Sequence, residues 1–294
     1  MRSRGFLSIV LVISLTAGCG GQAAPPSAEA VARLAEDSAG VRIAKRVWLD
    51  YGQAMPTPRA EDDLIVPVDI GEYSESRTTG VMRLGVDASD LTTTFHRTNV
   101  PEELKGLVPD DLSSMTTRAI SIGGSGTYEH RAGRKDVPAG KTWLHHNGSG
   151  CGAAARAVGS LDLRAILSPE VLRKLTAPAS SPEEVIDGVA TVLHAGSAPQ
   201  SEFGGQGPGD DPVTLAVLRE RFRSVEVSWR LWVGPDGLPR RLRLEAAMPA
   251  AGKGMPKTSV TEIDFTGWGS DIAIVPPPGE QVHETGSCLA AEPR

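Results

Sequence analysis

Apolar and polar residues alternate along much of the chain, which is the pattern of β-strands with one buried face. Between Val225 and Val233 every second residue is apolar, and the same period of two recurs over 241–245 and 262–265. Such alternation places one face of an antiparallel sheet against an apolar interior and the other face in water. The pattern therefore predicts a mainly β protein. The apolar positions that we expect on the inner face are Val227, Trp229, Leu231, Leu242, Leu244, Ile263 and Phe265.

A hairpin over 228–245 is the clearest local element. Its turn, Gly234-Pro235-Asp236-Gly237, combines a proline that presets φ with a glycine that tolerates a positive φ. A second apolar stripe, formed by Met82, Leu84 and Val86, predicts a further strand earlier in the chain.

Three short segments predict helices. Residues 27–39 are rich in alanine, with Ser27 as the expected N-cap, while 168–175 and 211–222 each begin with a cap residue followed by proline. The glycine- and proline-rich segment 196–211 is incompatible with a strand on this pattern, and we expect it to be a mobile loop. The helix over 211–222, next to this loop, is the expected lid of any cavity.

The first 18 residues form an export signal. Arg2 and Arg4 precede an uncharged stretch over 6–17, which is too short to span a bilayer. The sequence Thr16-Ala17-Gly18-Cys19 resembles the lipobox of bacterial lipoproteins, in which the signal is cut before the cysteine and its sulfur carries a diacylglycerol. An ordinary secretory signal with a chance cysteine is the alternative.

This resemblance sets the expected domain organisation and location. Residues 1–18 would be a lipoprotein signal peptide, 19–27 a tether and 28–294 a single domain. The protein would then be held at the cell membrane, on its extracytoplasmic face, by the lipid on Cys19.

Two further cysteines, Cys151 and Cys288, remain in the expected domain. In an oxidising, exported compartment an even pair is more often a disulfide than two free thiols, so a bridge between them is expected. Two unpaired buried thiols are the alternative.

The composition excludes some classes of function. The chain has 294 residues, 40% of them hydrophobic, which is enough to bury a large core. A net charge of −6 and an aromatic content of 4% argue against nucleic-acid binding.

The motifs for catalysis and metal binding are incomplete. Gly140-Lys141-Thr142 looks like the end of a phosphate-binding loop, but Lys135 stands where the upstream glycine is needed. His145 and His146 are adjacent, and adjacent residues of a strand point to opposite faces, so the two cannot easily bind one metal ion. We therefore expect no enzyme activity, no cofactor and no metal.

The order of the segments resembles that of actinobacterial lipoproteins of the LppX/LprG type, relatives of the LolA and LolB carriers. The segments that carry this resemblance are 122–128, 140–143, 186–196, 231–241, 261–269 and 276–278. The resemblance implies an α+β, mainly β fold: a curved antiparallel sheet, or half-open LolA-like barrel, with short helices covering its concave face. In that family the space under the helices is apolar and can hold acyl chains.

Two functions of different kinds follow. The first is a membrane-anchored lipoprotein that binds an apolar ligand, or carries lipid or lipoprotein, with the seven inner-face residues lining the cavity. The second is a cell-envelope module with a filled core that binds another protein. The same seven side chains suit a lined cavity and a filled core equally well, so the observation that separates the two is an enclosed apolar volume.

Overall fold

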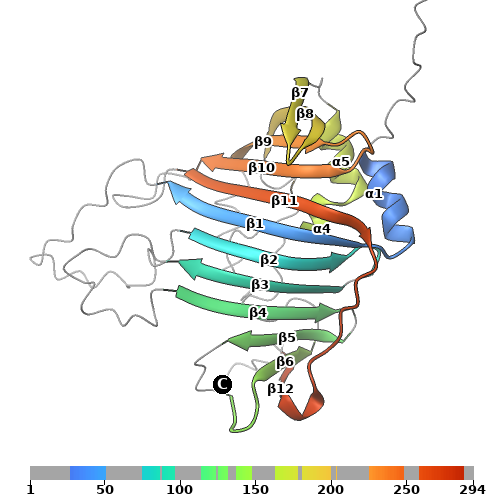
Figure 1. Cartoon of the computed structure of the whole chain (residues 1–294). Helices are drawn as coiled ribbons and strands as arrows, with labels where there is room; N and C mark the ends of the chain where they lie inside the picture. The colour runs from blue at the N-terminus through green and yellow to red at the C-terminus, as the bar shows by residue number, and fades with distance from the viewer. Residues whose placement is uncertain are drawn as a thin grey trace, which may run out of the picture.

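The computed structural model describes residues 27–50, 75–86, 88–96, 114–123, 125–131, 137–147, 163–177, 181–199, 203, 225–247 and 258–287. In these residues the chain forms one large sheet with a few short helices (Figure 1). None of the helices in these ranges is long and apolar enough to cross a membrane.

The sheet is built from two antiparallel runs of strands. Its order is β12-β6-β5-β4-β3-β2-β1-β11-β10-β9-β8-β7. The first run comprises β1 (Gly40–Asp50), β2 (Glu75–Arg83), β3 (Ala88–His96), β4 (Ser114–Ile122), β5 (Gly126–Arg131) and β6 (Trp143–Asn147). The second run comprises β7 (Ser181–Ile186), β8 (Val189–Pro199), β9 (Glu226–Val233), β10 (Pro239–Ala247) and β11 (Thr258–Ser270).

The two runs are joined by β1 and β11, which pair antiparallel and place Ile43 opposite Phe265. The last strand, β12 (Val282–Ser287), follows the short 3-10 helix η3 (Gly279–Gln281) and pairs with β6 in parallel. The expected antiparallel sheet is therefore confirmed for every described pair except this one, which makes the sheet mixed.

Three short helices, α1 (Ser27–Glu36), α4 (Leu163–Ile166) and α5 (Pro169–Thr176), gather on one side of the curved sheet (Figure 1). Their apolar side chains, among them Val31, Ile166 and Leu172, form the main core together with the strands. The mainly β fold class, with short helices over the concave face, is thus confirmed.

The inner face of β9–β11 agrees with the alternation in the sequence. The seven residues expected there are all between 0% and 5% exposed and belong to the main core. The charged residues between them, such as Arg230 and Glu262, are less buried because alternate side chains of a strand leave on the opposite face.

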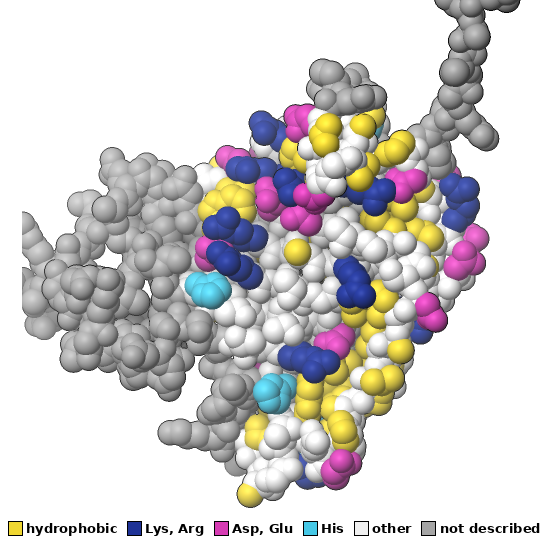
Figure 2. Space-filling view, in the orientation of Figure 1, with side chains coloured by type: hydrophobic (Ala, Val, Ile, Leu, Met, Phe, Trp, Pro, Cys, Tyr) yellow, Lys and Arg dark blue, Asp and Glu magenta, His cyan; other side chains and the backbone are white. Residues whose placement is uncertain are grey.

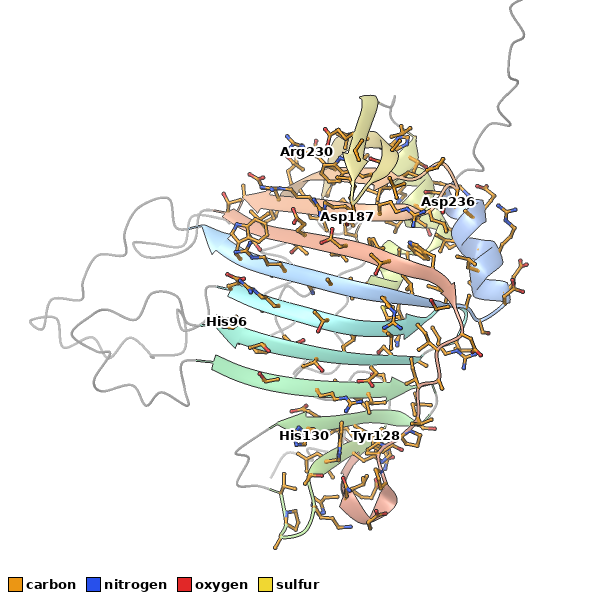
Figure 3. All side chains as sticks on the ribbon, in the orientation of Figure 1. His96, Tyr128, His130, Asp187, Arg230 and Asp236 are labelled. Carbon is orange, nitrogen blue, oxygen red and sulfur yellow. The ribbon has the colours of Figure 1, made fainter. Side chains whose placement is uncertain are left out.

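The predicted hairpin is present as β9 and β10. The backbone N–H of Gly234 donates to the carbonyl oxygen of Leu238 at 2.9 Å, and Gly237 has a φ of +78°. Figure 3 shows Asp236 in this turn, where its carboxylate pairs with Arg240 and accepts from the N–H of Leu238.

Two of the predicted helices are confirmed. Helix α1 ends at Glu36, earlier than predicted, and Ser27 is its first residue and not its N-cap, because the Ser27 hydroxyl donates to the carbonyl oxygen of Gly237 at 2.6 Å and so joins the helix to the β9–β10 turn. Helix α5 has Ser168 as its N-cap, with the side chain accepting from the N–H of Val171 and Pro169 at the first position. The third predicted helix, over 211–222, lies outside the described residues.

Two sequence predictions about strand ends are wrong. The stripe at 82–86 is not one strand. Strand β2 ends at Arg83, and both Leu84 and Val86 lie in the turn that leads to β3. The segment 196–211 does contain strand, because 196–199 complete β8. The small size of Gly196 makes room for Trp229, because a Cβ at position 196 would lie 2.7 Å from the Trp229 ring.

Most of 196–211, together with the mobility predicted for it, lies outside the described residues, although Phe203 is described and belongs to the main core. The predicted signal peptide, the predicted tether up to residue 26, and Cys19, Cys151 and Cys288 lie outside them as well.

A second, smaller apolar cluster lies on the opposite face of the sheet. It consists of Ile120, Trp143 and Val282, with Tyr128 and Ile274 packed against it. Figure 2 shows a band of hydrophobic side chains on this face, at the end of the sheet that carries β12. Ile274, in the segment between β11 and β12, packs against this cluster, and Figure 1 shows this segment running along the edge of the sheet.

Candidate functional site

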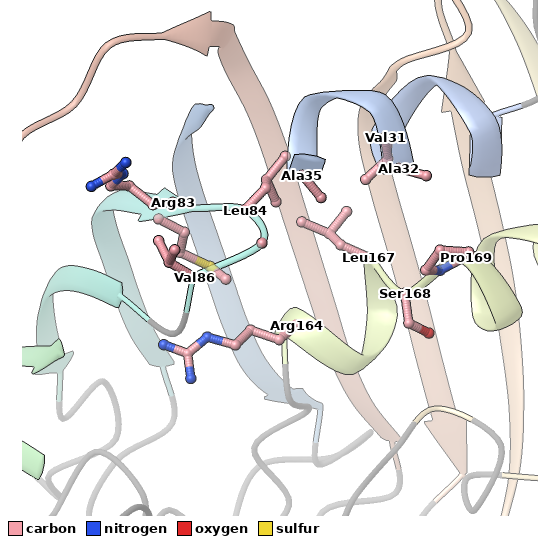
Figure 4. A pocket seen from close by; sticks show the side chains of 12 residues that line it. Val31, Ala32, Ala35, Arg83, Leu84, Val86, Arg164, Leu167, Ser168 and Pro169 are labelled. Carbon is pink, nitrogen blue, oxygen red and sulfur yellow. The ribbon is translucent and has the colours of Figure 1, made fainter. Parts of the chain in front are cut away.

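An apolar pocket of about 300 Å³, which is partly open to solvent and not an enclosed cavity, lies between α1, the β2–β3 turn and the α4–α5 segment (Figure 4). Helix α1 contributes Val31, Ala32 and Ala35 to its wall. The opposite walls come from Met82, Leu84 and Val86 in and after β2, and from Leu167 and Pro169 before and in α5.

The pocket exists because small residues face large ones. Ala35 lies beside the β2–β3 turn and Ala32 farther along α1, toward Pro169 (Figure 4), and their methyl groups leave space that a larger side chain would fill. Met82, Leu84 and Val86 do form an apolar stripe, as the sequence indicates, but the stripe lines this pocket instead of continuing a strand.

The turn that carries this stripe is pressed against the C-terminal end of α1. Gly85 has a φ of +73°, and a Cβ at this position would lie 1.9 Å from the carbonyl oxygen of Ala35. The N–H of Leu84 donates to the carbonyl oxygen of Ala39 at 2.8 Å. These contacts fix the width of the pocket on this side.

Two arginines are the charged residues among the described lining. Arg164, in α4, extends beneath the β2–β3 turn (Figure 4), and its Nη2 lies 3.5 Å from the hydroxyl of Ser89. Burial lowers the pKa of Arg164, although a guanidinium keeps its proton at neutral pH. Arg83 donates from Nε to the carbonyl oxygen of Ser38 at 3.2 Å.

The seven residues predicted to bind a ligand lie elsewhere. All are in the main core under the helices, and none of them lines this pocket. Phe265, for example, packs against Trp268 with ring centroids 5.8 Å apart. The structure therefore brings the seven together on one face, while the described pocket is lined by other residues.

Sequence reasoning missed this pocket, although two signals for it were present. One is the alanine-rich face of α1, and the other is an apolar stripe at 82–86 interrupted by Gly85. Neither signal indicates that the two segments meet, because their contact depends on the way β1 returns the chain from α1 to β2.

The adjacent histidines bind different partners on the outer and inner sides of β6. His145 contacts the carboxylate of Glu284 through Nδ1 and the carbonyl oxygen of Ser125 through Nε2, both at 2.6 Å. Its ring stacks on that of Tyr128 at a centroid distance of 4.3 Å. His146 contacts the hydroxyl of Thr285 through Nδ1 at 2.9 Å.

His145 and His146 therefore have structural partners, and Glu284 and Thr285 attach β12 to β6 through them. In the described ranges no group of three His, Cys, Asp or Glu side chains is placed to hold a metal ion.

The fold and pocket define a class of protein: one mainly β domain with a curved sheet and an apolar pocket at the edge of its helical cover. No protein-family model and no curated protein sequence matches the chain. Among solved structures it is similar to the crystal structure of LprF from Mycobacterium bovis, with 12% identity, a TM-score of 0.42, and coverage of 88% of this chain and 100% of that one. The function proposed for this chain rests on its own residues.

Proposed function

We propose that this protein is a non-catalytic, exported lipoprotein whose domain binds an apolar ligand of the acyl-chain class. The apolar pocket beside α1 is the observation that carries this proposal. Its volume of about 300 Å³ lies at the lower end of the range of small-molecule sites, which are concave and mostly apolar.

The lining explains why an acyl chain suits this pocket. Water in a space walled by Leu84, Val86 and Leu167 finds few hydrogen-bond partners, and such water is readily displaced. Burying a hydrocarbon there stabilises the complex by about 25 cal/mol for each Å² of apolar surface removed from water.

Membrane attachment and family are part of the same proposal. The lipobox at 16–19 supports a lipid anchor on Cys19, and the order of segments supports a relationship to the LppX/LprG type of lipoprotein. Replacing the anchor by Cys19→Ser is expected to move the protein from the membrane fraction to the soluble exported fraction. Unchanged membrane retention of this variant would refute the anchor.

The filled core favours a second function. The seven inner-face residues are at most 5% exposed and packed under the helices, as expected of a cell-envelope module that binds a protein partner instead of a ligand. The binding experiment described next separates the two functions.

The test uses the full chain carrying Cys19→Ser, recovered without detergent because detergent chains would compete. Dodecan-1-ol, an uncharged acyl probe, is titrated by calorimetry and by native mass spectrometry. We expect a one-to-one complex that Ala32→Phe abolishes, because the ring occupies the pocket, and that Ala44→Phe, an exposed change on β1, leaves intact. Absence of binding, or binding unaffected by Ala32→Phe, would favour the protein-binding module.

A further inference from the structure

We propose that the pocket binds one hydrocarbon tail of about twelve carbons and leaves the head group of the ligand in water. This inference rests on the proposed function and names its ligand class. The class is single-tailed amphiphiles, which the pocket selects by the length of the tail and not by the charge of the head group.

The walls of the pocket suit a tail and no particular head group. Apolar side chains line it on every side, among them Val31 from α1, Leu84 from the β2–β3 turn and Leu167 before α5. The free energy of such contacts follows the apolar area that they bury and is not directional. Any hydrocarbon tail that fits therefore gains the same stabilisation.

The two arginines of the lining have roles inside the protein. The guanidinium of Arg83 extends away from the pocket (Figure 4), and its Nε donates to the carbonyl oxygen of Ser38. Arg164 contacts Ser89 and has a further interaction within the protein. The described lining contains no aspartate or glutamate. A head group of either sign thus finds no unpaired charge among these described walls.

The open side of the pocket gives the head group a place in solvent. Val86 in the wall is 39% exposed, and Pro169 in the wall is exposed as well. A charged head keeps its hydration when only the tail enters, whereas burial of that head without a partner costs free energy. We therefore expect the tail to enter and the head to remain outside.

The size of the pocket limits the ligand to one tail. An apolar cavity of about 150 Å³ holds one benzene ring. The volume of about 300 Å³ is therefore enough for about twelve carbons, and further carbons emerge into water. Ala32 and Ala35 set this capacity on the α1 side, because a leucine at either position adds about three carbons to the same space.

A shallow surface groove is the competing explanation. Such a groove would accept two tails side by side or a tail of any length, so affinity would rise with every added carbon. A site that recognises the head group would instead rank ligands of equal tail by their charge. The experiment therefore varies head charge and tail length separately.

The first series keeps the dodecyl tail and changes the head. Dodecan-1-ol, dodecanoate and dodecyltrimethylammonium are titrated into the full chain carrying Cys19→Ser at neutral pH, below their micelle concentrations, by calorimetry and native mass spectrometry. We expect the three affinities to agree within about threefold, because each head remains in water. A larger difference, in either direction, overturns the inference.

The second series changes the tail, from hexan-1-ol to tetradecan-1-ol. We expect each added CH₂ to tighten binding about two- to fourfold up to about twelve carbons and to have little effect beyond that length. 1,2-Didecanoylglycerol is expected to bind within about threefold of monodecanoylglycerol, because its second tail finds no space. Affinity that rises along the whole series, or a much tighter two-tailed ligand, overturns the inference.

Variants of α1 test the origin of the length limit. Ala32→Leu and Ala35→Leu are each expected to move the limit from about twelve to about nine carbons, with the same effect for all three head groups. Leucine is a good helix former, so α1 is expected to persist. Ala44→Leu, an exposed change on β1, is the matched control and is expected to keep the limit at about twelve carbons.

The inference and the proposed function fail in different ways. Binding of dodecan-1-ol with a strong head preference, with no length limit, or with a limit that neither leucine variant moves overturns the inference and leaves the proposed function supported. If no probe binds, both fail. If neither leucine variant folds, the two series on the unsubstituted pocket decide the question.

Discussion

At the scale of single residues, the absence of a side chain at Gly85 determines the pocket most directly. Its positive φ and its contact with the carbonyl oxygen of Ala35 leave no room for a Cβ, so the β2–β3 turn can lie against α1 only with glycine here. The close approach of Gly85 to α1 thus places Leu84 and Val86 in the pocket wall.

We predict that Gly85→Ala lowers the free energy of unfolding by about 1–3 kcal/mol and weakens binding of dodecan-1-ol, because the turn must move away from α1. Gly140→Ala is the matched control: Gly140 also has a positive φ, +82°, but a Cβ there meets nothing within 4 Å. Urea denaturation measures both. Equal losses in the two variants would show that backbone conformation, and not the contact with α1, is responsible.

A second prediction concerns Glu75, whose carboxylate accepts from Arg46 at 2.9 and 3.1 Å and from Arg77 at 2.5 Å. The hydrogen bond from Arg46, followed by that from Arg77, lowers the pKa of Glu75 below its ordinary value. A carboxylate with a lowered pKa stabilises the fold at neutral pH, and this contribution is lost as the pH falls through the folded-state pKa.

Glu75→Gln is therefore expected to cost about 0.5–1 kcal/mol at pH near 7, the range of partly exposed ion pairs, and almost nothing in acid well below the ordinary pKa of 4.5. Denaturation curves at the two pH values measure the difference. Glu245→Gln, whose carboxylate lies 3.8 Å from Arg243 and is half-exposed, is the control and should show a smaller change. A cost for Glu75→Gln that is independent of pH would contradict this account.

Sequence alone predicts local residue properties better than long-range partners. It predicts that His145 and His146 face different sides, because this follows from the geometry of a strand. It does not predict that Glu284 and Thr285 are their partners, because those residues lie on a strand that returns from the far end of the chain. The same limit explains why the role of Arg164 in a pocket wall was not predicted.

At the scale of elements, those with their own start and stop signals were predicted correctly. The β9–β10 hairpin has a proline–glycine turn, and α5 has a serine cap followed by proline, so neighbouring residues suffice to define both. The stripe at 82–86 was misassigned because an apolar period of two is also compatible with a strand end followed by a turn. Residues 196–199 were misassigned because their glycine packs under Trp229, which only the neighbouring strand supplies.

The prediction at the scale of elements concerns Ser168, the N-cap of α5. Ser168→Ala removes the oxygen that accepts from the N–H of Val171 and is expected to destabilise the protein by about 1 kcal/mol. Ser168→Asp keeps an acceptor at the cap and should retain most of the stability. Thermal and urea unfolding measure both variants, and equal losses for alanine and aspartate would argue against a capping role.

At the scale of the whole molecule, β1 is the strand that makes one sheet out of two local runs. It pairs with β2, its neighbour in the chain, and with β11, which is remote in sequence. Alternating residues predict each strand and its inner face, but they do not specify which strands become neighbours. The mixed character of the sheet, introduced by the parallel β6–β12 pair, was therefore outside what the pattern could predict.

This pair bears on the expected disulfide. Ser287 of β12 pairs with Asn147 of β6, so the two strands end side by side. Cys288 is the next residue after Ser287, and Cys151 follows Asn147 closely in sequence. The register thus supports a bridge between these two cysteines, which would hold the last strand to the sheet.

We predict that the full chain with Cys19→Ser, unfolded without reductant, shows no titratable thiol, and that reduction lowers the free energy of unfolding by about 2–4 kcal/mol. Cys151→Ser and Cys288→Ser are expected to match the reduced protein and to be insensitive to reductant. Two free thiols, or identical melting with and without reductant, would rule the bridge out.

The central place of β1 also determines when the sheet can close. This strand precedes the other strands of the described residues, yet one of its two long edges pairs only with β11, which is synthesised much later. Pairing between strands that are remote in sequence has to wait until both partners are available. The order of the strands therefore delays the joining of the two runs of the sheet until β11 has been synthesised.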